Sequence, residues 1–290
     1  MHNGNNMKKV SILGSGNIGC DLLVKCIKEK DIELVSIGGR NADSKGLKFA
    51  KTYGIPTSDR SIQGIISDFK KPDIIIDATN ALDHHRNYEI AKANGIKIID
   101  MTPSKIGESC CPIVNIKKCL NQDNISMISC GGQSAMPICH AIKLVNKGLT
   151  YIEVVSTISS ASAGPATRKN ISQYISSTEE AISKMLEIDK VKIILNITPA
   201  LPPIEMSTTI LIKKEDIVDI QRTWDEIQEI SRKTREYVPG YKNNLPLKEI
   251  GEKIICQIKV NGSGDYLPKY AGNLDIINCA AIEVVKQLND

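Results

Sequence analysis

The sequence predicts an α/β protein in which a doubly wound parallel sheet, covered by helices on both faces, is followed by a second domain of α+β character. In the first half, short apolar runs alternate with helical segments, which is the pattern of a parallel sheet. Beyond Gly148 the strand-like runs are separated by longer helices. A chain of 290 residues also exceeds the usual size of one compact domain, so we expect two cores.

The expected strands of the first half are short, apolar and bounded by polar residues or glycine. Between them lie segments whose apolar residues recur at three- and four-residue spacing, as on one face of a helix. Strands that alternate with helices in this way pair in parallel, because each crossover returns the chain to the same edge of the sheet. We expect strands at 10–13, 33–37, 74–76, 96–99 and 125–128, and helices at 47–53, 62–69 and 88–94.

A glycine-rich turn follows the first strand and reads Gly14-Ser15-Gly16-Asn17-Ile18-Gly19. Because it joins a strand to a helix, its first glycine can make the tight turn and its second can let the backbone approach a pyrophosphate. The third can pack helix on strand. The diphosphate would then rest on the N-terminus of the helix. The motif therefore predicts a Rossmann-type dinucleotide site, the alternative being a glycine turn without a ligand.

The end of the second strand bears on which dinucleotide is bound. The chain reads Gly38-Gly39-Arg40-Asn41 there, with no acid at the strand tip. An acid would bond the ribose 2′-hydroxyl of NAD, whereas an arginine can accept the 2′-phosphate of NADP. Arg40 therefore leaves NADP open beside NAD, although a loop arginine that points into solvent explains it equally well. Asp43 could still reach the ribose.

Cys130 is the candidate nucleophile. It stands between the strand at 125–128 and an expected helix with Pro137 in its first turn. At such a junction a thiol lies near unpaired backbone N–H groups and the positive end of a helix dipole, which favour the thiolate. Gly131 and Gly132 are expected to leave the thiol sterically open. The alternative is one more small apolar residue in a core.

The second half alternates strand-like runs with longer helices, and its last helix is expected to return to the first domain. We expect Ser177 and Glu180 to form a capping box at a helix start. The stretch from Ser162 to Asn170 combines small residues with a basic end, which suits close approach of a ligand, the alternative being a structured loop. The expected domains are residues 1–130 completed by 272–290, and 131–271; the expected strands are 153–158, 192–197, 208–212 and 254–260.

Composition argues against several classes of partner. Dispersed charges, 37 basic and 33 acidic, together with 4% aromatic residues, indicate neither nucleic acid nor an anionic membrane as a partner. The first apolar run is too short for a signal peptide, so we expect a cytoplasmic protein whose nine cysteines are reduced. We expect no metal site, because the adjacent pairs Cys110-Cys111 and His84-His85 lack the spacing of ligands.

Six segments, taken in order, form a set that spans nearly the whole chain: Gly14 to Gly19, Asp100 to Pro103, Cys110 to Asn115, Cys130 to Gln133, Ser162 to Asn170, and Tyr266 to Asp275. In this ordered set the chain resembles the acylating acetaldehyde dehydrogenases of catabolic pathways that end in an aldolase. The resemblance implies a Rossmann domain, a second domain used for dimerisation, and conversion of a short aldehyde, NAD and coenzyme A to acyl-CoA and NADH.

The resemblance also implies roles for individual residues and partners. Cys130 is the nucleophile, and its thioester is resolved by the thiol of coenzyme A. We add the hypothesis that N–H groups near Gly131 and Gly132 hold the oxyanion. A homodimer and a 4-hydroxy-2-oxovalerate aldolase partner, in the catabolism of aromatic hydrocarbons, are implied as well. The implied cofactor contacts are Ser15, Gly16, Asn17, Ile18, Ser162, Ala163, Gly164, Pro165, Ala166, Thr167, Arg168, Lys169, Asn170 and Asn273.

The chain departs from the family pattern at positions that matter for mechanism. Thr208 stands where the family carries an aspartate that helps deprotonate the nucleophile, and threonine cannot serve as a base. Glu205, three residues earlier, would point to the opposite face of a strand. Ala166 stands where glycine is expected. The run between Tyr241 and Tyr266 is shorter than the family pattern, and the missing stretch is expected to remove a hairpin, which weakens the inference of an aldolase partner.

Two other functions remain open at this point. A phosphorylating or reductive semialdehyde dehydrogenase would pair the cysteine with a histidine, and none of the four histidines is convincingly placed for that. His140, ten residues after Cys130, is interpreted as a surface or packing residue, because the helix carries it away from the glycine turn. A dinucleotide-binding regulator without catalysis is the third interpretation, and Thr208 is the residue that favours it.

Overall fold

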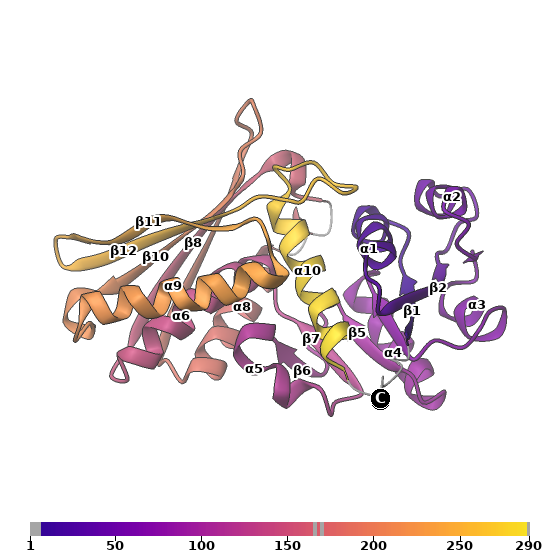
Figure 1. Ribbon diagram of the computed structural model, residues 1–290, viewed down its shortest axis with the longest axis horizontal. Helices are drawn as coiled ribbons and strands as arrows, with labels where there is room; N and C mark the ends of the chain where they lie inside the picture. The colour runs from indigo at the N-terminus through magenta and orange to yellow at the C-terminus, as the bar shows by residue number, and fades with distance from the viewer. Residues whose placement is uncertain (1–6, 165–166, 169–170, 289–290) are drawn as a thin grey trace, which may run out of the picture. The chain divides into compact units, whose positions relative to one another are not determined.

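The computed structural model describes residues 7–164, 167–168 and 171–288, and the contacts between residues divide the chain into two compact units (Figure 1). The first unit comprises Met1–Cys110, Ile116–Met127 and Ala281–Asp290. The second comprises Cys111–Asn115 and Ile128–Ala280. The first unit is therefore assembled from both ends of the chain.

The first unit contains a seven-stranded sheet in the order β3-β2-β1-β4-β5-β7-β6, in which every neighbouring pair is parallel. The order runs outward from β1 in both directions, which is the doubly wound arrangement that the alternating pattern predicts. The fold class is thus confirmed. The strands are β1 (Lys8–Leu13), β2 (Ile32–Gly38), β3 (Thr57–Ser58), β4 (Ile74–Asp77), β5 (Lys97–Asp100), β6 (Glu108–Cys110) and β7 (Asn124–Met127).

The helices of the first unit follow the expected ones closely, with α4 as the main difference. Helix α4 begins at Ala81, seven residues before the expected start, because Asn80 caps it by accepting hydrogen bonds from the N–H groups of Leu82 and Asp83. Its first turns are too polar to show an apolar face. The helices are α1 (Asn17–Lys28), α2 (Lys45–Thr52), α3 (Ser61–Ser67), α4 (Ala81–Ala93) and α5 (Pro112–Cys119), the last of which passes from the second unit into the first.

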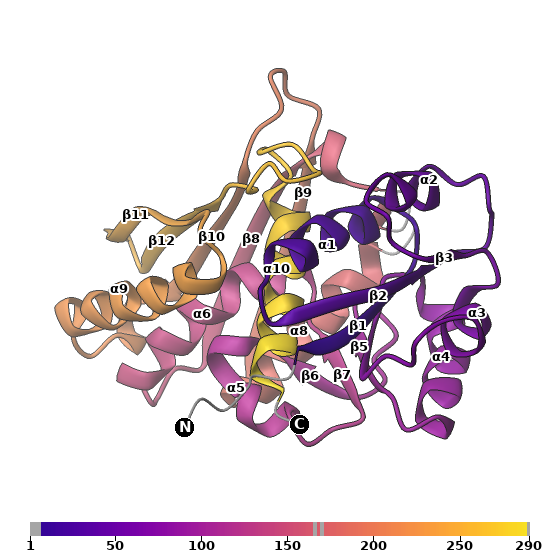
Figure 2. The same cartoon turned by 45° about the vertical axis from the view of Figure 1, so that its right-hand side comes forward.

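The second unit contains a five-stranded sheet in the order β11-β12-β10-β8-β9, antiparallel except for the β8–β9 pair. Helices α6, α8 and α9 lie on one side of this sheet (Figures 1 and 2). Its elements are α6 (Cys130–Val145), β8 (Tyr151–Ser159), α8 (Ile171–Leu186), β9 (Lys190–Thr198), β10 (Met206–Lys213), α9 (Ile220–Tyr237), β11 (Tyr241–Ile250), β12 (Lys253–Val260) and α10 (Gly272–Gln287), the last of which ends in the first unit.

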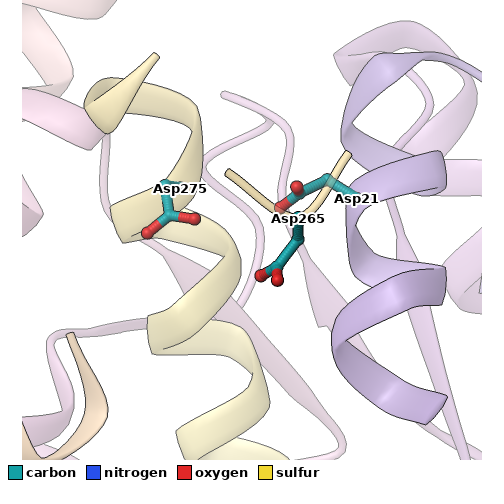
Figure 3. A group of neighbouring side chains, drawn as sticks. All are labelled: Asp21, Asp265 and Asp275. Atoms are coloured by element: carbon teal, nitrogen blue, oxygen red, sulfur yellow. The ribbon is translucent and has the colours of Figure 1, made fainter. Parts of the chain in front are cut away.

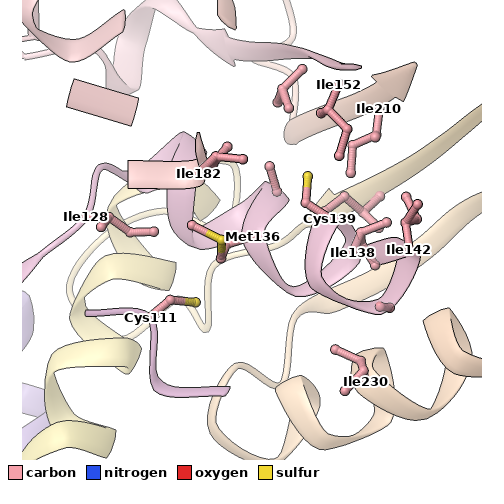
Figure 4. Close-up of a cluster of buried hydrophobic side chains, with 14 of the residues drawn as sticks. Cys111, Ile128, Met136, Ile138, Cys139, Ile142, Ile152, Ile182, Ile210 and Ile230 are labelled. Carbon is pink, nitrogen blue, oxygen red and sulfur yellow. The ribbon is translucent and has the colours of Figure 1, made fainter. Parts of the chain in front are cut away.

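The core of the second unit lies between the sheet and these helices (Figure 4). Along β10, the side chains of Met206, Thr208, Ile210 and Ile212 are buried, whereas the alternate residues between them remain partly exposed. This period of two is that of a strand with one packed face. The other face of the sheet is only partly buried within the described chain.

Two expectations about the second half are wrong for local reasons. Helix α6 begins at Cys130, so Pro137 lies inside it and not in its first turn. Ser129 caps this helix, but the two glycines that follow Cys130 have low helix propensity and make a later start look more plausible. Ser177 and Glu180 lie within α8 and form no capping box at its start. The run after Tyr241 forms a hairpin, β11–β12, whose edge strand β11 is polar and irregular in register.

Candidate active site

The glycine turn of the first unit has the geometry that its motif predicts. Gly14 has φ of +125°, and a Cβ there would lie 2.6 Å from the carbonyl oxygen of Ala78, so another residue would be strained and would clash. A Cβ at Gly19 would lie 2.0 Å from the carbonyl oxygen of Gly14, which shows how closely α1 packs on the turn. Around Gly16 no atom lies within 4 Å of the Cβ position. The backbone there is open to a ligand.

The N-terminus of α1 has features of an anion-binding site. Gly16 is the N-cap and supplies no side-chain cap, and the first turn contains no acidic residue. Gly16 and Asn17 are exposed, while Ser15 and Ile18 are partly buried. The Oγ of Ser44 donates to Ser15 Oγ at 3.0 Å, which ties the start of α2 to the turn. These residues fit the pyrophosphate of a dinucleotide, because exposed N–H groups at a helix start attract anions.

Arg40 has a carboxylate partner within the first unit. Its guanidinium lies 3.1 Å from the carboxylate of Asp83, and the two side chains are 73% and 44% exposed. Such an exposed pair contributes little free energy, so a phosphate could displace Asp83. Asp43 pairs with Lys48 at 2.9 Å. Arg40 and Asp43 are therefore the two side chains near the strand tip that could distinguish NAD from NADP.

A buried polar cluster at the carboxyl ends of β4 and β5 was missed from the sequence. His84 is fully buried; its Nδ1 lies 2.9 Å from Asp77 Oδ2, and its Nε2 lies 3.4 Å from Asp100 Oδ2. Burial by itself lowers the pKa of His84, but the hydrogen bond with Asp77 and the charge of Asp100 outweigh it and raise that pKa. Aspartates that end two neighbouring apolar strands were the available signal, because parallel strands place them at one edge.

Cys130 occupies the first position of α6 in the second unit. Ser129 caps the helix, its Oγ accepting the N–H of Gly132 at 3.0 Å. Of the nine cysteines, eight are buried and Cys130 is partly exposed. The position at a helix start and the exposure both favour a reactive thiol over a small core residue. The amide of Gly132 donates to this cap, which argues against the expected role for it in holding an oxyanion.

Tyr174, on the first turn of α8, is the side chain that hydrogen-bonds to Cys130 among the residues described. Its hydroxyl oxygen lies 3.7 Å from Sγ. A Cβ at Gly131 would lie 2.1 Å from the same hydroxyl. The glycine therefore makes room for Tyr174, and the thiol is less open than its glycine neighbours predict. Tyr174 lies 44 residues after Cys130 and belongs to no motif, so no local pattern predicts this contact.

The electrostatics of the thiol are set by neutral groups. Burial raises the pKa of Cys130 above its ordinary value, while the Tyr174 hydroxyl and the backbone N–H groups of Gly131 and Cys130 oppose that rise. Burial also raises the pKa of Tyr174 well above its usual range, and the neighbouring Cys130 adds to the effect. His140 lies ten residues along α6, about 15 Å away at the rise of an α-helix, and burial lowers its pKa. It is not a base for Cys130.

Thr208 belongs to a cluster of buried hydroxyl groups. Its Oγ1 lies 2.8 Å from Ser134 Oγ and 3.4 Å from Ser156 Oγ, and the residue is fully buried on the core face of β10. Ser156 Oγ would lie 3.1 Å from a Cβ at Gly131, so the cluster extends to the neighbourhood of the thiol. All three hydroxyls are neutral at ordinary pH. Glu205 precedes β10 and is not part of the cluster.

A second set of predicted cofactor contacts lies near the start of α10. Asn273 is buried, and its Nδ2 donates to the carbonyl oxygen of Ser162 at 3.2 Å. Its Oδ1 has no hydrogen-bond partner among the described residues, and a buried acceptor of this kind fits the donor of a ligand.

The basic end of the same segment folds back on it. Arg168 Nε donates to the carbonyl oxygen of Ala163 at 3.0 Å, and the N–H of Arg168 donates to Gly164 at 3.2 Å. Thr167 is partly buried. The structure thus joins Ser162, Ala163 and Asn273 in the second unit, whereas the glycine turn belongs to the first. The predicted contacts Pro165, Ala166, Lys169 and Asn170 lie outside the described residues.

Aspartates of both units are drawn in Figure 3, and each has a different setting within its own unit. Asp21 lies on α1 of the first unit and pairs with Lys25 at 3.4 Å. Asp275 lies in the first turn of α10, where its carboxylate accepts a hydrogen bond from Ser263 at 3.4 Å. Asp265 lies in the loop before that helix. We assign no metal to these carboxylates.

The architecture has a counterpart among solved structures. It is similar to the crystal structure of aspartate semialdehyde dehydrogenase II from Vibrio cholerae, with a TM-score of 0.64 and 12% identity. The match covers 98% of this chain and 100% of the other. At that identity the likeness shows the fold alone, a Rossmann-type sheet with a second α+β unit.

Sequence comparison then identifies the family. Residues 130–268 match the model of the prokaryotic acetaldehyde dehydrogenase dimerisation domain. The acetaldehyde dehydrogenase of Pectobacterium atrosepticum is 43% identical over 100% of this chain and 98% of its own length, and that of Spirochaeta aurantia is 42% identical over 96% and 94%. The chain belongs to the acetaldehyde dehydrogenase family. Membership implies a dinucleotide cofactor, as the glycine turn does.

No helix in the described part of the chain combines the length and apolar character that a membrane crossing requires.

Proposed function

We propose that this protein is an NAD-dependent, CoA-acylating acetaldehyde dehydrogenase in which Cys130 carries the acyl group. One observation supports this best: the single partly exposed cysteine stands at a helix N-terminus beside a phenol donor. Family membership and the dinucleotide turn agree with it. Thiols buried in apolar surroundings are inert, so the other eight cysteines do not compete for this role.

The proposed chemistry has two halves. The Cys130 thiolate adds to the carbonyl carbon of the aldehyde, and loss of hydride converts the adduct to a thioester. When bound, the dinucleotide supplies the hydride acceptor. The thiol of coenzyme A then attacks the thioester carbonyl, releases acyl-CoA and returns Cys130 to its starting state. The backbone N–H groups of Gly131 and Cys130 are the donors that remain beside the sulfur, since the Oγ of Ser129 accepts that of Gly132.

NAD is the dinucleotide we propose, with NADP as the alternative. The strand tip after β2 offers no acid for the ribose, but Arg40 already has Asp83 as a partner and would have to leave it to hold a 2′-phosphate. The NAD assignment therefore needs no rearrangement of Arg40. A comparison of KM for the two dinucleotides tests it directly.

A homodimer is the assembly that we propose. The face of the second sheet turned away from its helices carries partly exposed apolar side chains, among them Val155, Leu211 and Ile255. Apolar residues on an uncovered sheet face are typical of an interface. The match to a dimerisation model over 130–268 covers these strands. Co-purification with a 4-hydroxy-2-oxovalerate aldolase would add the second partner that the resemblance implies.

The experiment is an absorbance assay of NADH formation from acetaldehyde, with and without coenzyme A, on the parent protein and on Cys130→Ser. The proposal predicts steady turnover that needs coenzyme A and is lost in Cys130→Ser. Turnover that needs phosphate instead would support a phosphorylating semialdehyde dehydrogenase. Dinucleotide binding without turnover on any of these substrates would support the non-catalytic regulator. Cys110→Ser, at a buried thiol of the first unit, is the matched control.

A further inference from the structure

We propose that Tyr174 is a further catalytic residue, a neutral hydrogen-bond donor that stabilises the thiolate of Cys130. The inference deepens the proposed function, on which its consequence for turnover rests, but its effect on the thiol can be measured without turnover. Tyr174 would supply part of the activation that the family takes from an aspartate, in a chain that has Thr208 at that place.

The contact is built from several elements and is not an accidental approach of two side chains. The hydroxyl lies 3.7 Å from Sγ, within hydrogen-bond range for sulfur. Thr178, one turn along α8, donates to the backbone carbonyl of Tyr174 at 2.6 Å. The same Thr178 hydroxyl lies 2.6 Å from the Oγ of Ser129, the cap of α6. The first turn of α8 is thereby fastened to the helix start that carries Cys130.

Gly131 is the second part of the device. A Cβ at this position would lie 2.1 Å from the Tyr174 hydroxyl and 3.2 Å from its ring carbon Cζ. Any larger residue at 131 would therefore push the phenol away from the sulfur. The absence of a side chain at Gly131 therefore lets the Tyr174 hydroxyl lie next to the Cys130 sulfur.

The direction of the hydrogen bond follows from the acidities of the two groups. Burial and the neighbouring thiol hold the pKa of Tyr174 well above its usual range, so the phenol keeps its proton. When Cys130 ionises, its proton leaves to solvent and the phenol donates to the sulfur anion. The pKa of Cys130 is raised by burial and lowered by Tyr174 and by two backbone amides. No charged side chain of the described residues takes part, so loss of the phenol donor is not masked by a nearby charge.

The hydroxyl cluster around Thr208 strengthens the assignment. Thr208 hydrogen-bonds to both Ser134 and Ser156, all three are buried, and none of them can take a proton from a thiol at ordinary pH. An alkoxide in that place would be desolvated. These residues therefore favour activation of Cys130 by hydrogen-bond donors that stabilise its thiolate, and not by a base that removes its proton.

The test is the pH dependence of Cys130 alkylation by iodoacetamide, followed by mass spectrometry of the peptide that contains Cys130. Only the thiolate reacts, so the midpoint of the profile reports the pKa of the thiol. For Tyr174→Phe we expect the midpoint to rise by about one pH unit, and the rate near neutral pH to fall about tenfold, with the plateau at high pH unchanged. Tyr241→Phe is the matched control, because it removes a buried phenol that donates to the carbonyl oxygen of Ser134 at 2.8 Å.

A second variant guards against a folding defect in the first. Gly131→Ala keeps the phenol but displaces it, and it should move the midpoint in the same direction. Far-UV circular dichroism and thermal unfolding show whether each variant is folded. Midpoints within about 0.2 units of the parent in both folded variants would overturn the proposal.

Turnover separates this proposal from the proposed function. In an active enzyme, Tyr174→Phe should lower kcat about tenfold near neutral pH, with KM for the aldehyde changed less than about twofold. A shifted alkylation midpoint in a protein without any dehydrogenase activity would sustain the role of Tyr174 toward the thiol and defeat the proposed function. An unshifted midpoint in an active enzyme would do the reverse.

Discussion

The buried imidazole of His84 permits a quantitative prediction about the first unit. His84→Leu removes both ring nitrogens and leaves the carboxylates of Asp77 and Asp100 buried without them. Removal of one partner from a buried ion pair costs about 3–5 kcal/mol. Both carboxylates keep other donors, including Thr79 and Ser104, so we expect a loss near the lower end, about 3 kcal/mol.

The pH dependence of this loss has a defined sign. The pKa of His84 is raised in the folded protein, so its contribution to stability is fully present below the unfolded value of about 6.5 and is lost as the pH rises through the folded pKa. The difference in free energy of unfolding should thus be larger near about pH 6 than near about pH 9.

Urea unfolding followed by far-UV circular dichroism measures both quantities. His85→Leu is the matched control, because His85 is the next residue of α4 and is exposed. We expect it to change the free energy of unfolding by less than about 0.5 kcal/mol. If His84→Leu costs less than about 1 kcal/mol at both pH values, the imidazole does not hold the two strand ends as an ion pair.

Three further predictions concern the dinucleotide turn, its specificity and the sheet face. Gly16→Ala should fold normally yet weaken NADH binding about tenfold or more by fluorescence titration, whereas Gly19→Ala, whose Cβ would meet the turn at 2.0 Å, should also lower thermal stability. Arg40→Asp should change KM for NAD less than about twofold, and a large change in the preference between NAD and NADP would show that Arg40 reads the 2′-position. Leu211→Asp should convert dimer to monomer in sedimentation velocity, and an unchanged dimer would move the interface elsewhere.

The parts of the fold that could be predicted are those with a local signal. Strands β4 and β5 are continuous apolar runs between polar segments. The glycine turn can be recognised from six consecutive residues. Strands β3 and β6, of two and three residues, are too short to show any period. β11 is polar because one side of an edge strand has no partner to bury it.

In the candidate site, too, the residues with a local signal could be predicted and those brought in by tertiary packing could not. Cys130 could be proposed because the features that predict a reactive thiol, a strand end, a glycine pair and a helix start, are its neighbours in the chain. Tyr174 and Ser156 reach the same place from α8 and β8, and only tertiary packing brings them there. His84 was set aside as a metal ligand, although the aspartates ending β4 and β5 are the groups that hold it.

The most direct measurement is intact-protein mass spectrometry after the protein is mixed with acetaldehyde and NAD in the absence of coenzyme A. We expect the mass to rise by one acetyl group per subunit, with the group on Cys130 by peptide mapping, and one NADH formed for each. Coenzyme A should then remove the group as acetyl-CoA. NADH formation with Cys130 unmodified, or with the acetyl group on a different cysteine, would contradict the assignment of Cys130 as the acyl carrier.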